Sequence, residues 1–416
     1  MTPAMTPLIT PRKEPMSSRR PLLIVSGTLL LAALAGCSST AGQMAASAAP
    51  EEPSAGHGAV TGAAEVAEPP LQLVSIDAHG AVSSLDLLDG SEVELGSIEA
   101  PRSAATDGRY VFAETDGAVA VIDSGVWTWD HVDHFHYYRS EPSILGEVPG
   151  EGPVSVSTGA LSTAGATGLF FAGSGEAVLL DNAELSRGRL VETLRVQTAA
   201  PGGVIAPLGD GALLSDADGG LAFHDAAGGS VPGAPCTAPS GSITTRAGLV
   251  VGCAEGAVVA RMERDEPVFE TVPYPVGVAA ERAMSFDARK GRPTVAAVAG
   301  DRGFWLLDVR ERAWQLIETP VPLARAVASD DADGSVVALD ESGRVRVYGA
   351  SGEERATTAP LVEVAAGVTL SVDAQRAYLN DPAAGVVHEI AYADGARIAR
   401  TLATPTVPAF FAEVGR

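Results

Sequence analysis

The sequence predicts an all-β protein, a β-propeller of seven or eight blades with about four strands in each blade. Three observations lead to this fold: a recurring segment from glycine to aspartate, a spacing near 40 residues between its copies, and a composition rich in turn residues. Of the 416 residues, 46 are glycine and only 19% are charged. Such a composition is typical of many short strands joined by tight turns.

The repeat is the main evidence for the propeller. Four copies have the same spacing, namely Gly80 to Asp86, Gly117 to Asp123, Gly175 to Asp181 and Gly219 to Asp225. Weaker copies surround Gly256, Gly303, Gly343 and Gly385. The glycines are 37 to 58 residues apart, and self-similarity near 40 residues indicates propeller blades. A pair of β-sandwiches does not predict the fixed register, and a β-helix needs shorter repeats.

The number of blades depends on how the ring closes. Eight candidate units are present, but propellers often close by pairing strands from both ends of the chain. The first or the last unit is then shared between the two ends, so seven blades also fit.

The first 36 residues have the form of a bacterial lipoprotein signal peptide. A basic segment ending at Arg20 precedes the apolar run Pro21 to Ala35, and the run stops directly before Gly36-Cys37. A single-pass membrane helix fits less well, because the run is shorter than the roughly 20 residues that a span needs. We therefore expect an exported protein, lipidated at Cys37 and anchored to the outer face of the cytoplasmic membrane. The sequence leaves open whether the Sec or the twin-arginine route exports it.

A flexible tether and the propeller domain follow the signal peptide. Residues 37–70 are mostly small residues, glutamate and proline, a composition that buries too little apolar surface to fold. His57 within this stretch is best interpreted as a solvated linker residue. Residues 71–416 are the predicted propeller domain.

The charge of the chain limits its partners. The net charge is −24, and the segment 1–36 carries four basic residues and one glutamate, so its removal leaves −27. This balance argues against nucleic acid and against an anionic membrane surface as partners, so we expect membrane contact through the lipid anchor only. Cations and basic protein surfaces fit the charge better.

Besides Cys37, the chain has two cysteines, Cys236 and Cys253. In an oxidising compartment two such residues are expected to form a disulfide. The chain-entropy estimate for a loop of this length is about 3 kcal/mol of stabilisation. A pair of zinc-binding thiolates is disfavoured, because the spacing is not that of a C-x-x-C motif.

The candidate metal site lies in the stretch Trp127 to Tyr138, which holds three of the seven histidines. The candidate ligands are His131, Asp133, His134 and His136. Imidazole and carboxylate suit zinc, although copper and nickel also bind such ligands. In an extended strand His134 and His136 share one face and His131 and Asp133 the other, whereas in a loop all four converge.

The position of this stretch also favours a functional role. It falls in the longest step between repeat glycines, so we expect an insertion on an otherwise regular blade, and such insertions often carry function. The two tryptophans and two tyrosines around the ligands are expected to pack against the blade. The alternative is a surface loop that is rich in histidine by accident.

Two further histidines, His224 and His388, are weaker candidates. His224 takes the place of Leu85, Ile122 and Leu180 in the sister repeats, so it is either an additional zinc ligand or a core histidine satisfied by a backbone carbonyl. His388 is a similar case with a less regular register. His79 lies beside a turn glycine and is interpreted as a turn residue.

Three stretches resemble the AztD family of exported zinc metallochaperones: Trp127 to Arg139, Arg289 to Pro293, and Tyr392 to Thr401. The resemblance covers most of the mature chain. It implies a β-propeller that binds zinc outside the cytoplasm and delivers it to the solute-binding protein of a zinc ABC importer. It assigns zinc ligation to His131, Asp133, His134 and His136, and His224 and His388 are candidates for a second site.

Two other classes of function remain as alternatives. A zinc-dependent hydrolase or lyase would use His and Asp ligands with an open position, but we find no motif for a nucleophile or a general base, so we expect a protein that is not an enzyme. A metal-independent scaffold for protein contacts at the cell surface is the other alternative. Zinc content and zinc transfer distinguish these classes from the metallochaperone.

Overall fold

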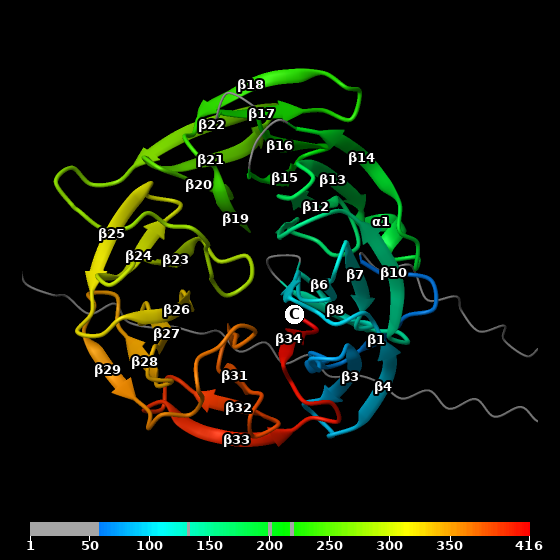
Figure 1. The fold of residues 1–416 in the computed structure, drawn as a ribbon, viewed down its shortest axis with the longest axis vertical. Helices are drawn as coiled ribbons and strands as arrows, with labels where there is room; N and C mark the ends of the chain where they lie inside the picture. Colours follow the sequence, from blue (N-terminus) through cyan, green and yellow to red (C-terminus); the bar gives the residue numbers. More distant parts are fainter. Residues whose placement is uncertain (1–57, 131–133, 199–201, 217–219) are drawn as a thin grey trace, which may run out of the picture. The chain divides into compact units, whose positions relative to one another are not determined.

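The structure, a computed structural model, describes residues 58–130, 134–198, 202–216 and 220–416. In these residues eight antiparallel sheets follow one another around a ring, which confirms the predicted β-propeller and gives eight blades (Figure 1). No helix in the described part of the chain has the length and apolarity to cross a membrane.

The blades are numbered in the order in which they follow along the chain. Blade 1 consists of β34 (Phe410–Val414), β2 (Gln72–Ile76), β3 (Ala81–Asp86) and β4 (Glu92–Ser97). Blade 2 consists of β5 (Ser103–Thr106), β6 (Tyr110–Glu114), β7 (Ala118–Asp123) and β10 (Ser143–Pro149). Blade 3 consists of β11 (Val154–Thr158), β12 (Ala166–Phe171), β13 (Glu176–Asp181) and β14 (Glu192–Gln197), with helix α1 (Asn182–Leu185) before its last strand. Blade 4 consists of β15 (Ile205–Leu208), β16 (Gly211–Ser215), β17 (Gly220–His224) and β18 (Ser230–Pro235).

The second half of the ring repeats this arrangement. Blade 5 consists of β19 (Ser240–Thr245), β20 (Gly248–Cys253), β21 (Gly256–Glu263) and β22 (Glu266–Pro273). Blade 6 consists of β23 (Thr294–Val298), β24 (Gly303–Asp308) and β25 (Ala313–Glu318), and Asp287 bridges to Ala296 in the place of a first strand. Blade 7 consists of β26 (Leu323–Ala328), β27 (Val336–Asp340), β28 (Val345–Tyr348) and β29 (Glu354–Thr357). Blade 8 consists of β30 (Leu370–Val372), β31 (Ala377–Asp381), β32 (Val386–Ala391) and β33 (Arg397–Ala403).

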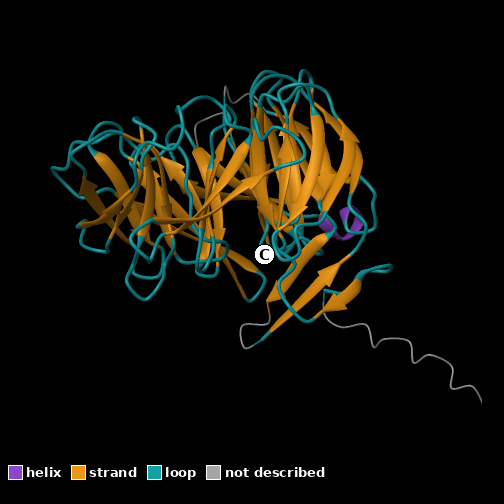
Figure 2. Cartoon of the chain, turned by 90° about the horizontal axis from the view of Figure 1, so that it is seen from below, coloured by secondary structure: helices purple, strands orange, loops and turns teal. Residues whose placement is uncertain are grey.

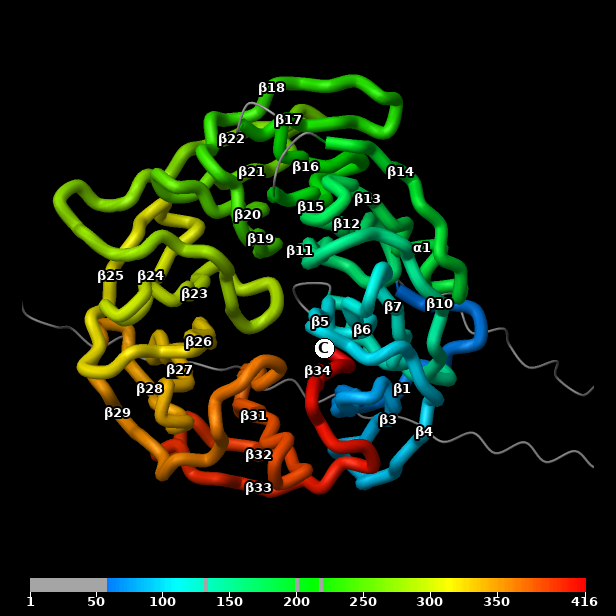
Figure 3. The backbone as a smooth tube through the Cα atoms, viewed as in Figure 1, coloured from blue at the N-terminus to red at the C-terminus, as the bar shows by residue number. Residues whose placement is uncertain are grey.

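Strands from both ends of the described chain close the ring. β34 pairs antiparallel with β2 over five positions, from Ile76 opposite Phe410 to Gln72 opposite Val414. In Figure 3 the red end of the chain lies beside the blue one at this point. The sharing of one blade between the two ends agrees with the sequence analysis. It does not reduce the count to seven, because the eighth repeat is a complete blade.

The glycine-to-aspartate repeat is the third strand of a blade together with its two turns. Gly80 and Gly117 have φ angles of +96° and +88° directly before β3 and β7, a conformation that glycine adopts without strain. The aspartate at the other end stabilises the turn into the fourth strand, as when Asp86 Oδ1 accepts the Leu88 N–H at 2.8 Å. The repeat therefore marks both ends of the third strand in blades 1, 2 and 3.

The core consists of apolar layers between neighbouring blades. Val74 and Ile76 of blade 1 pack with Val111 and Ile122 of blade 2, and Leu73 of blade 1 packs with the buried face of blade 8. Both faces of a blade are therefore buried, which agrees with the nearly continuous burial of the middle strands β2 and β3.

Blade 2 carries the predicted insertion. Between β7 and β10 the chain forms a hairpin of β8 (Val126–Asp130) and β9 (Phe135–Arg139), and β1 (Ala64–Val66) pairs with the outer edge of β9. Figure 2 shows this small sheet projecting from one face of the ring. β1 lies inside the segment 37–70 for which composition predicts a flexible tether, so at least residues 64–66 of that segment form part of a sheet. The physical reason is tertiary, because β9 offers an edge with which even a short strand can pair.

Candidate metal centre

The histidine-rich stretch forms a β-hairpin whose register decides which side chains meet. Trp127 lies opposite Tyr138 and Trp129 opposite His136. Because side chains alternate along a strand, His136 and Tyr138 share one face of β9, and His134, the residue before β9, contacts His136 on that face. The connection between the strands, residues 131–133, lies outside the described residues. The predicted ligands His131 and Asp133 belong to it.

His134 and His136 are brought together. Their Nε2 atoms are 3.1 Å apart and their ring centroids 4.9 Å apart. Two imidazole nitrogens bound to one tetrahedral zinc ion at about 2.0–2.1 Å each would be about 3.3 Å apart. The two rings therefore already approach the spacing that a shared metal ion requires.

A carboxylate that the sequence analysis did not select lies beside them. Glu65, at the centre of β1, places Oε1 2.7 Å from Nδ1 of His136. The contact joins residues 71 positions apart, and it depends on β1 pairing with β9, where Glu65 lies opposite Tyr138. No local pattern marks Glu65, because it stands in a segment whose composition resembles a linker.

The root of the hairpin rests on a buried ion pair. Arg109 donates from Nε and one terminal nitrogen to the two carboxylate oxygens of Asp123, at 2.9 and 2.7 Å. Burial lowers the pKa of the Arg109 guanidinium, but the hydrogen bond and charge of Asp123 outweigh that effect, and the net pKa shift is upward. The group remains charged inside the protein.

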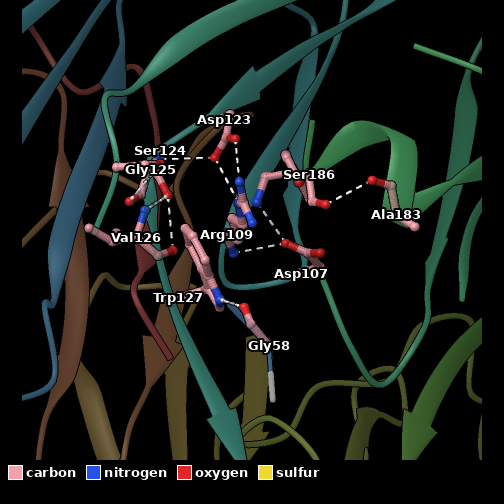
Figure 4. Close-up of polar contacts among 12 residues, drawn as sticks. Gly58, Asp107, Arg109, Asp123, Ser124, Gly125, Val126, Trp127, Ala183 and Ser186 are labelled. Carbon is pink, nitrogen blue, oxygen red and sulfur yellow. Dashed lines mark hydrogen bonds and ion pairs between the residues drawn. The ribbon is translucent and has the colours of Figure 1, made fainter. Parts of the chain in front are cut away.

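Aromatic rings connect this ion pair to the histidines. The Trp127 ring lies 3.8 Å above the Arg109 guanidinium carbon, and its Nε1–H donates to the Gly58 carbonyl at 3.0 Å (Figure 4). Tyr138 stacks on Trp127 at 5.3 Å between centroids, and His136 stacks on Tyr138 at 6.3 Å. Trp127 and Tyr138 are 1% and 2% exposed, so the support beneath His136 is rigid and buried, as expected for the aromatic residues of this stretch.

Three contacts attach the hairpin to the ring. Thr128 donates its hydroxyl to the Gly415 carbonyl at 2.6 Å. Asp130 forms an ion pair with Arg246 of the turn after β19, and Arg139 forms one with Asp86. The hairpin thus contacts blades 1 and 5 as well as its own.

The other candidate histidines lie elsewhere on the ring. His224 ends β17 in blade 4, opposite Ala212 and Ser230. His388 lies in β32 of blade 8, with Nε2 3.9 Å from the Asp381 carboxylate. His79 lies in the turn between β2 and β3, as expected for a turn residue. Within the described residues no group of three His, Cys, Asp or Glu side chains is arranged to hold a metal ion, so the hairpin pair needs further ligands.

Cys236 and Cys253 form the expected disulfide, with Cα atoms 5.1 Å apart. Cys236 follows β18 and Cys253 ends β20, so the bond joins blade 4 to blade 5. Cys37 and His57 lie outside the described residues.

The other two stretches that resemble AztD are also located. Lys290, within Arg289 to Pro293, donates from Nζ to the Arg416 carbonyl at 2.9 Å. Tyr392 to Thr401 spans the turn between β32 and β33.

Comparisons with solved structures identify proteins of the same fold. The chain is similar to AztD from Citrobacter koseri, with 20% identity and a TM-score of 0.71, over 83% of this chain and 97% of that one. The apo form of Citrobacter koseri AztD matches with the same values. No protein-family model and no curated protein sequence matches the chain. The resemblance to AztD is therefore confirmed at the level of the fold.

Proposed function

We propose that this protein is an extracytoplasmic zinc-binding metallochaperone that delivers zinc to the solute-binding protein of a zinc ABC importer. The observation that carries the proposal is the approach of the His134 and His136 Nε2 atoms to 3.1 Å on a hairpin that projects from the ring. The AztD-like fold and the AztD-like sequence of the same hairpin support it.

The zinc ligands of the proposal are those of the sequence analysis. His134 and His136 supply two imidazole nitrogens, and His131 and Asp133, from the connection between the two strands, complete the set. This would give four neutral or carboxylate ligands, which hold zinc less permanently than a closed four-thiolate site. His224 in blade 4 and His388 in blade 8 stay candidates for zinc binding outside the hairpin, and because they lie in different blades they do not form one site with each other.

Delivery to a partner fits the position and the charge of the hairpin. His134 is exposed, so a docking protein can approach the ion without any opening of the propeller. The net charge of −24 favours both the capture of a cation and the steering of a partner with a basic face. Lipidation at Cys37 would keep the donor beside the importer in the membrane.

Two measurements test the proposal. Purified wild-type protein should bind zinc, and the triple variant His131→Ala/His134→Ala/His136→Ala should lose this zinc. A matched variant, His79→Ala, removes a histidine from a turn in blade 1 and should keep it. Zinc-loaded protein should then transfer zinc to the apo solute-binding protein faster than that partner takes up zinc from a solution whose free zinc is set by a chelator. A wild type that binds no zinc at micromolar concentrations contradicts the proposal. If the partner takes up zinc equally fast from the loaded protein and from the chelator-buffered solution, the protein binds zinc but does not deliver it.

A further inference from the structure

The strand β1 is a separate structural unit that reaches the candidate zinc pair from outside the hairpin. It has three residues, and all three pair with β9: Ala64 with Arg139, Glu65 with Tyr138 and Val66 with Tyr137. Ala64 and Glu65 are exposed and Val66 is partly buried. The ladder of three pairs buries little apolar surface, and the Gly58 carbonyl, six residues earlier, accepts a hydrogen bond from Trp127.

Glu65 contacts His136 across this ladder. It lies opposite Tyr138, so His136 is its diagonal neighbour on the same face of the sheet, a pairing within reach of a long side chain. The Glu65 side chain is 54% exposed and that of His136 is 23% exposed. The 2.7 Å contact between Oε1 and Nδ1 is therefore accessible to solvent at its edge and can be broken without disturbing the core.

The chemistry of the contact determines the state of His136. A carboxylate only accepts hydrogen bonds, so the Nδ1–H group of His136 must donate the hydrogen bond to Glu65. The neutral ring then carries its lone pair on Nε2. Nε2 is the atom that faces His134. Carboxylates that bind the distal nitrogen of a histidine ligand fix its tautomer and orientation and make it a stronger ligand. Since Glu65 contacts Nδ1, it acts from the opposite side of the ring rather than on the ion that Nε2 would bind.

We infer that Glu65 is a positioning residue for His136, and that the docking of β1 onto β9 sets the affinity of the hairpin for zinc. The inference rests on the proposed zinc function. With β1 docked, His136 is oriented and correctly protonated for the ion. With β1 undocked, the same hairpin holds zinc more weakly. The segment that connects the propeller to residues 1–57 thereby controls the retention of zinc.

The test compares variants that remove the carboxylate, the docking, or neither. Glu65→Gln removes the charge and keeps the size of the side chain. Ala64→Pro/Val66→Pro keeps Glu65 but removes ladder donors, so that β1 cannot pair. Glu68→Gln removes another exposed carboxylate, two residues after the strand, and serves as the matched control. Zinc dissociation constants come from competition with a chelator, and the His136 tautomer comes from ring-nitrogen NMR of the zinc-free full chain.

The expected result is a loss of about 10–100-fold in zinc affinity for Glu65→Gln, the range found when a group that supports a metal-bound histidine is removed. The double proline variant should show a similar loss, and Glu68→Gln should stay within about twofold of wild type. In the zinc-free protein only Glu65→Gln and the proline variant should shift His136 away from the tautomer protonated on Nδ1. A wild type that binds zinc while Glu65→Gln binds it equally well overturns this inference alone. A wild type that binds no zinc overturns it together with the proposed function.

Discussion

Trp127 is the side chain through which the fold supports the candidate zinc pair, and its replacement is the sharpest test of that support. The ring is 1% exposed, lies on Arg109 and under Tyr138, and donates to the Gly58 carbonyl. Trp127→Phe keeps an aromatic ring but removes the N–H donor and leaves the carbonyl without it. We expect the free energy of unfolding to fall by about 1 kcal/mol, the net contribution of a typical hydrogen bond, because Gly58 is only partly buried. Trp127→Ala should cost about 3–5 kcal/mol.

The zinc measurement separates local support from general stability. Trp305 is a matched control, because it is also 1% exposed, donates from Nε1 to the Glu281 carbonyl at 2.7 Å and stacks on Tyr274 in a different part of the ring. Trp305→Phe should reduce the free energy of unfolding by a similar amount. Only Trp127→Phe should also weaken zinc binding, because Tyr138 and His136 stack above it. Urea unfolding and chelator competition measure the two quantities. Equal zinc affinity in the two variants would refute the proposed role of the aromatic stack.

Three further predictions concern the ring itself. Replacing Cys236 and Cys253 by alanine should lower the free energy of unfolding by about 3 kcal/mol in the chain-entropy model. A reductant should shift the urea midpoint of the wild type but not that of the variant. Identical midpoints for the oxidised wild type and the variant would contradict this. Arg109→Ala and Asp123→Ala should each lower the free energy of unfolding by about 3–5 kcal/mol, because each leaves a buried charge unpaired. In a double-mutant cycle the double variant should lose less than the sum of the two single losses. Additive losses would argue against the ion pair. Burial raises the pKa of Glu413 from 4.5 to about 7, so the folded state keeps this proton to higher pH than the unfolded state does. The contribution of this proton to the free energy of unfolding is complete below pH 4.5 and is lost as the pH rises through 7. In Glu413→Gln the free energy of unfolding should fall by about 3 kcal/mol less than in the wild type over this pH range, as measured by the urea midpoint at each pH. An equally steep fall in the variant would refute the prediction.

The fold was predictable because the third strand of several blades begins after a turn glycine and ends at an aspartate. Gly80 and Gly117 require the positive φ that their turns adopt, and Asp86 caps the next turn. These constraints act over about seven residues, so they remain visible in a single sequence. The number of blades was harder to predict, since the closure of the ring by β34 and β2 joins segments that are far apart in the chain.

The candidate site was predictable only in part, for the opposite reason. The approach of His134 to His136 follows from alternation along a strand. Glu65 and Arg109 were missed, because their partners are 71 and 14 residues away and tertiary pairing alone brings them together. His224 shows the limit of register arguments: the histidine stands at the end of β17 in blade 4 and shares no group of three potential ligands with the described residues of the hairpin.

The contacts of the hairpin with the ring have a consequence for the order of assembly. Thr128 is bound to Gly415 and Asp130 to Arg246, and Gly415 directly follows the strand that closes the propeller. The hairpin can form early from its own strands, but its contacts with Gly415 and Arg246 are complete only after the ring has closed. Zinc that arrives before closure would meet two imidazoles without this support, whereas zinc that arrives afterwards would meet the supported pair. Under the proposed function, the zinc pair is therefore fully supported only after the ring has closed.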